Sequence, residues 1–170
     1  MKKSLLLTSL LATSLMPSFV EATASKNVLF DTLSLKEGNP KSIELKEVIE
    51  NVFKVITDMN AVNEDYAQYI SKDYVQNVDG EILKYNGFID HMKALKKSVK
   101  SITIVFHDII TEGNKVVTRH TAYAVKNDNK DIEIQVIAIF EVKDGKIISC
   151  NELTHMQKGE TADRDLGSRR

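Results

Sequence analysis

One glutamate near the end of the last apolar stretch has the setting that acid–base chemistry needs. If alternate residues of this stretch face inward, Glu152 lies among apolar side chains such as Phe106, Val136 and Ile148. A carboxyl group that loses its hydration holds its proton more tightly, so its pKa rises toward neutrality. Such a group can take and return a proton near pH 7, which is general acid–base catalysis. The alternative is that Glu152 pairs with Arg119 or lies at the rim in water.

A second group of side chains could bind the polar part of a small molecule. The guanidinium group of Arg119 could orient a carboxylate or a carbonyl, with Asp108 beside it, although the two charges could equally neutralise each other. Four neutral hydrogen-bonding side chains could line the mouth of a pocket around Glu152: Tyr74, Gln76, Thr121 and Tyr123. Tyrosines of small domains also serve in the core with the hydroxyl at the surface, so both interpretations stay open.

The histidines and the cysteine do not form a metal-binding pattern. His91, His107, His120 and His155 show neither H-x-H nor H-E-x-x-H spacing, and the chain has a single cysteine, Cys150. Zinc sites need three or four such ligands at short, regular spacings. We therefore expect no metal and no cofactor, and we interpret Cys150 as a small buried apolar residue.

Helices precede strands along the chain. Apolar residues at three- and four-residue spacings predict a long helix that begins at Asn39-Pro40, a shorter helix from Asn63, and a third helix from Asn86. From position 101 onward, β-prone runs separated by turn sequences predict an antiparallel meander. These runs are 102–111, 115–126, 131–142 and 146–154.

Composition narrows the possible partners. With 170 residues the chain has room for one domain with a sizeable core. The formal net charge of −1 argues against the basic surface that nucleic acids require, and one cysteine excludes an internal disulfide.

The two ends of the chain differ from the rest. Lys2 and Lys3, the apolar run 4–16 and a small-x-small site ending at Ala24 predict a signal peptide over 1–24, followed by a polar lead-in over 25–38. No cysteine stands at the cleavage site to carry a lipid, so we expect an exported protein, periplasmic or secreted, without a membrane anchor. The polar tail 157–170 is expected to be exposed; the alternative is that it folds over the pocket as a lid or docks on a second subunit.

The order of elements resembles the nuclear transport factor 2-like superfamily, above all its SnoaL-like (polyketide cyclase-like) branch. The most telling pieces are EGNKVVTR at 112–119 and FEVKDGKII at 140–148. The resemblance covers 39–156 and implies an α+β fold: a cone-shaped domain of three N-terminal helices packed on a curved antiparallel sheet, a cystatin-like α+β roll. It also implies a pocket between the long helix and the concave face of the sheet.

The same resemblance bears on catalysis. In the polyketide cyclases an aspartate after the final hairpin acts as general acid–base without a cofactor, and Glu152 is at the similar position, one methylene longer. The polar companion of that aspartate falls at or near Ala138, whose side chain cannot transfer a proton.

Turn lengths predict which side chains share the concave face. Two-residue turns at 113–114 and 128–129, and a bulge at Gly145, would place Glu152 on this face. The other members would be Ile104, Phe106, Asp108, Ile110, Val117, Arg119, Thr121, Tyr123, Ile134, Val136, Ala138, Phe140, Ile148 and Cys150.

The opposite, convex face would then carry a second apolar set. Its members would be Val105, His107, Ile109, His120, Ala122, Ala124, Ile137 and Ile139. No further segment is left to cover it, and an uncovered apolar sheet face is usually an interface. We therefore expect a homodimer through the convex face, as is common among members of the superfamily.

Two functions remain open. The chain could be an exported pocket-containing domain that binds a small apolar ligand, or a cofactor-independent isomerase, cyclase or dehydratase that uses Glu152 as general acid–base. Glu152 favours the enzyme, and Ala138 favours the binding domain.

Overall fold

The computed structural model describes residues 28–30 and 40–168. The expected signal peptide lies outside the described residues, as does most of the lead-in 25–38. The elements in chain order are β1 (Val28–Phe30), α1 (Pro40–Thr57), α2 (Asn63–Tyr69), β2 (Ile70–Val78), β3 (Glu81–Lys84), α3 (Tyr85–Ser98), β4 (Val99–Glu112), β5 (Lys115–Lys126), β6 (Asp131–Lys143), β7 (Lys146–Lys158) and the 3-10 turn η1 (Thr161–Asp163).

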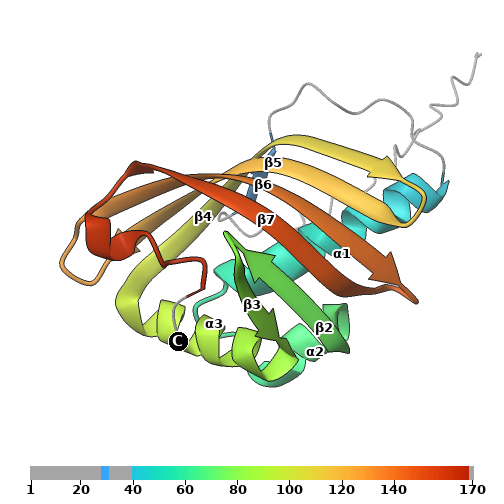
Figure 1. Cartoon of the computed structure of the whole chain (residues 1–170), viewed down its shortest axis with the longest axis horizontal. Helices are drawn as coiled ribbons and strands as arrows, with labels where there is room; N and C mark the ends of the chain where they lie inside the picture. Colours follow the sequence, from blue (N-terminus) through green and yellow to red (C-terminus); the bar gives the residue numbers. More distant parts are fainter. Residues whose placement is uncertain (1–27, 31–39, 169–170) are drawn as a thin grey trace, which may run out of the picture.

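The fold is α+β, with three helices on one side of a curved sheet (Figure 1). The strand order is β1-β4-β5-β6-β7-β2-β3. Strands β4 to β7 form the expected antiparallel meander. The sheet is larger than expected, because β1 from the lead-in joins β4 in parallel and the β2–β3 hairpin joins β7 through a parallel β2–β7 pair.

The helices cover the sheet with the apolar stripes that their sequences predict. Helix α1 begins at Pro40 and buries Ile49, Val52 and Phe53. The hydroxyl of Thr57 closes its last turn by donating to the carbonyl of Phe53, 3.0 Å away. Among the described residues, no helix is both long and apolar enough to cross a membrane.

The loop between β5 and β6 is one residue longer than predicted. Lys126 and Lys130 close it with a backbone hydrogen bond of 2.8 Å, which leaves three residues, 127–129, in the loop. Asn129 there has φ +67°, the left-handed conformation typical of the last position of three-residue hairpin loops. A one-residue change in a loop turns every side chain of the strand to the other face.

Strand β5 therefore presents the opposite face to the helices from the one predicted. A bulge at His107 in β4 accommodates the change, because the β4–β5 pairing shifts between Phe106 and Asp108. The predicted turn at 113–114 is present and Asp108 does pair with Arg119, but both face the convex side, as do Thr121 and Tyr123. The concave face instead carries His120, Ala122 and Ala124.

The hairpin between β6 and β7 places Glu152 on the concave face by a different route from the predicted one. Asp144 and Gly145 form a two-residue turn, both with positive φ (52° and 73°), and the bulge follows at Ile148. Ile147 rather than Ile148 is buried. Beyond the bulge Glu152 pairs with Ala138, inside the cone.

The chain after β7 turns back toward α3 (Figure 1). We call residues 159–168 the strap. Much of it is exposed, but Asp163 and Leu166 are only 2% and 7% exposed. The prediction of an exposed tail is therefore wrong for these two residues, because a polar segment with a single leucine gives no periodic signal of burial.

Candidate functional site

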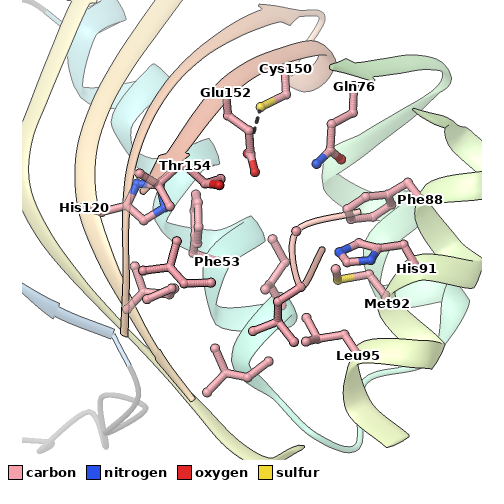
Figure 2. Close-up of a pocket in the computed structure, with 18 of the residues that line it drawn as sticks. Phe53, Gln76, Phe88, His91, Met92, Leu95, His120, Cys150, Glu152 and Thr154 are labelled. Atoms are coloured by element: carbon pink, nitrogen blue, oxygen red, sulfur yellow. Dashed lines mark hydrogen bonds between the residues drawn. The ribbon is translucent and has the colours of Figure 1, made fainter. Parts of the chain in front are cut away.

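A cavity of about 130 Å³ lies between the concave face of the sheet and helices α1 and α3 (Figure 2). Its wall is mostly apolar. The lining residues are Phe53, Ile56, Tyr74, Gln76, Phe88, His91, Met92, Leu95, Ile102, Ile104, His120, Ala122, Ala124, Ile134, Val136, Phe140, Cys150, Glu152, Thr154, Leu166 and Gly167.

Aromatic rings fill one part of the cone. Phe53 of α1 stands edge-on to Phe106 and to Phe140, with ring centroids 5.0 and 6.0 Å apart. It also contacts the ring of His120 at 5.1 Å. These contacts set one boundary of the cavity and leave the space beside α3 open.

Glu152 is the acidic side chain among the lining residues. Its carboxylate accepts a hydrogen bond from the Cys150 thiol, with Sγ and Oε2 3.5 Å apart (Figure 2). Burial raises the pKa of Glu152 to about 7; the thiol works against this rise and the charge of Asp79 adds to it. The group is thus close to half-protonated at neutral pH, which is the state that proton transfer in either direction requires.

Polar side chains of the neighbouring strands β2 and β7 lie close to Glu152. The parallel pairing of β2 with β7 puts Gln76 beside Cys150. The buried Tyr74 hydroxyl donates to Gln76 Oε1 at 3.1 Å. Burial raises the pKa of Tyr74 well above its ordinary value, and the nearby Cys150 and Glu152 raise it further. Tyr74 therefore stays a neutral hydrogen-bond donor near Glu152.

His120 is a second titratable group of the cavity, and the sequence placed it on the wrong face. His120 on β5 pairs with Val136 on β6, which in turn pairs with Thr154 on β7. Glu152 lies two residues before Thr154 on the same strand. The Nδ1 of His120 shares a 3.0 Å hydrogen bond with the buried hydroxyl of Thr118. Burial, and then the charge of His107, lowers its pKa to about 4, so the ring is neutral at physiological pH.

His91 enters the cavity from α3 (Figure 2). The sequence could have shown this residue, because it lies three residues after Phe88 and four before Leu95 on the apolar stripe of the helix. The turn sequence Asn127-Asp128-Asn129, in contrast, does not distinguish a two-residue from a three-residue loop, so nothing local indicated His120.

The predicted site residues divide into two groups. Glu152, Tyr74 and Gln76 line the cavity, whereas four others lie outside it: Asp108, Arg119, Thr121 and Tyr123.

The inward position predicted for these four is wrong, because the β5–β6 loop and the β4 bulge turn them to the convex face. Asp108 and Arg119 form an ion pair of 2.6 Å there, with each side chain about half exposed. Thr121 shares a hydrogen bond with His107, and Tyr123 is 40% exposed.

Ala138 occupies the place between Glu152 and Thr118 in the same row across the sheet, and it is fully buried. Ala138 thus stands between Glu152 and Thr118, whose hydroxyl holds His120. Within the described part of the chain, no group of three or more His, Cys, Asp or Glu side chains could hold a metal ion.

Comparison with known proteins identifies the family of the chain. The family model of the SnoaL-like domain matches residues 49–150. An uncharacterised protein of Schizosaccharomyces pombe is 37% identical over 127 residues, which are 75% of this chain and 98% of that protein.

Solved structures share the fold. A protein of Bacillus cereus assigned as a polyketide cyclase superposes with a TM-score of 0.59 at 23% identity, over 86% of this chain and 94% of that one. A SnoaL-like polyketide cyclase assigned in Jannaschia sp. CCS1 gives 0.60 at 12% identity, over 70% and 90%. An epoxide hydrolase of M. tuberculosis gives 0.59 at 18% identity, over 68% and 86%. The chain therefore belongs to the SnoaL-like family of the nuclear transport factor 2-like superfamily.

Proposed function

We propose that the protein binds a small, largely apolar molecule through a carbonyl or hydroxyl group that contacts Glu152. The observation that carries this proposal is a single carboxyl group in a cavity whose wall is mostly apolar, with no lysine or arginine among the described residues that line it. Small-molecule sites typically combine an apolar wall with a few convergent polar groups.

The protonation of Glu152 defines what the ligand offers. Below pH 7 the protonated carboxyl can donate to a carbonyl oxygen, and above pH 7 the carboxylate can accept from a hydroxyl. A cavity of about 130 Å³ takes a molecule of one ring, since a cavity of about 150 Å³ holds benzene.

Benzaldehyde and toluene make a matched pair of probes, because both have one ring and only the first has a carbonyl. At pH 6 we expect benzaldehyde to bind about tenfold more tightly than toluene, as a buried hydrogen bond predicts. In Glu152→Leu the preference should vanish, whereas in Glu133→Gln, a change on the convex side of β6, it should persist. Equal binding of both probes to the natural protein would refute the proposal.

An enzymatic function is the second candidate, and the pKa of Glu152 near 7 favours it. In this scheme the carboxylate removes a proton from the carbon beside a ketone, the electron pair moves to the oxygen as an enolate, and the proton then returns to carbon.

Cyclopentanone in D₂O tests this step, because NMR reports the exchange of its α-hydrogens for deuterium. We expect exchange above the buffer rate with the natural protein and loss of that excess in Glu152→Gln. Exchange at the buffer rate would exclude this chemistry for small ketones.

We also propose that residues 1–24 direct export. The support is the charged, apolar and small-x-small sequence order described above. N-terminal sequencing of the exported protein should begin at Ser25; recovery of Met1 would contradict the proposal.

A homodimer through the convex face is a further proposal. Ile110 of β4, Ile137 and Ile139 of β6 and Leu153 of β7 are 44–68% exposed on the convex face of the meander. The concave position predicted for Ile110 is therefore wrong. Sedimentation should show a dimer that Leu153→Glu dissociates while Lys72→Glu does not; a monomeric natural protein would refute it. The convex position predicted for His120 is wrong, because His120 lines the cavity.

A further inference from the structure

The strap closes the cavity over the carboxyl group of Glu152. Leu166 is buried in the core cluster and lines the cavity, and Gly167 follows it. A Cβ atom on Gly167 would lie 3.6 Å from Glu152 Oε1 and 3.0 Å from Val78 Cγ1. The strap thus forms the wall directly against the reactive group, and position 167 has no room for a side chain unless Val78 moves.

Charged side chains hold the strap to the end of β5 and to the loop that follows it. Lys126 contacts the carboxylate of Asp163 at 3.1 Å, and this carboxylate is 3% exposed. Glu160 joins Lys126 at 2.9 Å and Lys130 at 2.8 Å. These hydrogen bonds lower the pKa of Glu160 to about 2, so it stays charged over the physiological range. We call this group the clamp.

We propose that the strap is a lid on the Glu152 site: its residue Leu166 occupies part of the ligand space, and the clamp must release before a ligand larger than one ring can bind. This inference rests on the proposed function and adds its mechanism of access. Pockets for larger organic ligands exceed about 300 Å³, whereas the closed cavity measures about 130 Å³. Displacing Leu166 and Gly167 enlarges the cavity on the side where Glu152 lies.

The lid explains the chemistry of the closed site as well. Gly167 lies against the carboxylate and keeps bulk water from it, which sustains the desolvation of Glu152. A lifted strap would hydrate the carboxylate and return its pKa toward the ordinary range. Access to the site and protonation of Glu152 are therefore coupled through one short segment.

A reversible covalent lock tests the movement. The contact between position 167 and Val78 Cγ1 puts the two Cβ atoms within about 4.5 Å, which suits a disulfide. The variant Val78→Cys/Gly167→Cys, with Cys150→Ala to prevent mispairing, is oxidised and mixed with 1-tetralone, a two-ring ketone. We expect binding in the reduced form and its loss in the oxidised form; equal binding rates in both forms would overturn the lid.

Weakening the clamp gives a second test that does not rely on the lock. Asp163→Asn should raise the association rate of 1-tetralone about tenfold, as the loss of a charged hydrogen bond predicts. Asp131→Asn is the matched control, because Asp131 pairs with Lys158 on the surface at 2.8 Å and does not hold the strap. Equal rates in Asp163→Asn and the natural protein would overturn the role of the clamp.

The carboxyl titration separates the lid from the proposed function. In ¹³C NMR spectra, Asp163→Asn should lower the pKa of Glu152, while Asp131→Asn leaves it unchanged. If benzaldehyde binds no more tightly than toluene, the proposed binding function fails, but a lowered pKa in Asp163→Asn still supports the lid. If 1-tetralone binds to no form of the protein, the lid fails as the route for larger ligands. An unchanged pKa in Asp163→Asn, with no effect of the lock on that pKa, refutes it.

Discussion

Replacing Glu152 with Gln should change how the stability of the protein depends on pH. Glutamine keeps the shape and hydrogen-bonding capacity of the glutamic acid but cannot ionise. In the natural protein the folded state holds the Glu152 proton up to about pH 7, whereas the unfolded chain releases it near 4.5. Between these values the folded state binds more protons, so stability falls as pH rises. Glu152→Gln removes this fall.

The size of the effect follows from the two pKa values. The difference between about 7 and 4.5, at about 1.4 kcal/mol per pH unit, gives about 3 kcal/mol. Glu152 as a whole residue keeps an intermediate solvent exposure, and this residual hydration reduces the penalty. We therefore expect Glu152→Gln to gain about 2–3 kcal/mol over the natural protein between pH 5 and pH 8.

His120 acts in the opposite direction over part of this range. Its pKa of about 4 in the folded protein lies below the ordinary 6.5, so the unfolded chain binds more protons between these values. Stability then rises with pH from about 4 to 6.5. The two slopes nearly cancel in the natural protein up to pH 6.5, and only the fall due to Glu152 remains above it.

Urea titrations at half-unit steps from pH 4.5 to 8 measure the difference between the two proteins. His120→Gln is the matched control, because it should show the fall due to Glu152 without the opposing rise. Parallel curves for Glu152→Gln and the natural protein would show that the carboxyl group is hydrated in the folded state, and would refute the reasoning.

Three further predictions concern packing and the turns. Thr118→Val removes the 3.0 Å hydrogen bond to His120 and should lower the free energy of unfolding by about 1–2 kcal/mol in urea; a loss under about 0.5 kcal/mol would contradict the buried bond. Phe53→Ala should lower it by about 3–5 kcal/mol by the same measurement, because the ring packs on three others; a loss below about 2 kcal/mol would mean that the cavity collapses around the gap. Gly145→Ala should cost about 1 kcal/mol, since φ there is +73°, and an unchanged midpoint would argue against this turn.

The elements of the fold follow from the sequence because their signals are repetitive. The apolar stripe of α1 and the alternation in β6 each extend over many residues, so one exception does not hide them. The concave positions predicted for Val136, Ala138 and Phe140 are confirmed for this reason.

Half of the candidate site depended instead on single residues. One additional loop residue, Asn127, and one bulge, at His107, exchange the faces of β5. Neither residue type by itself indicates a longer loop or a bulge. Which loop length and which bulge are stable depends on how the strands pack on α1. Glu152 was placed correctly because the bulge at Ile148 has the same effect on the later residues as the predicted bulge at Gly145.

The parallel pairing of β2 with β7 has a consequence for the order of folding. Asp79, at the end of β2, accepts two hydrogen bonds from Thr154, and these residues are 75 positions apart in the chain. Contacts at such separation form only after the intervening loop has closed, which makes them late events in folding. Substituting Thr154 should therefore speed unfolding and leave the folding rate nearly unchanged. Glu152 pairs with Val78 where β2 meets β7. Transient separation of these two strands would therefore expose the carboxyl group to water before the rest of the sheet separates.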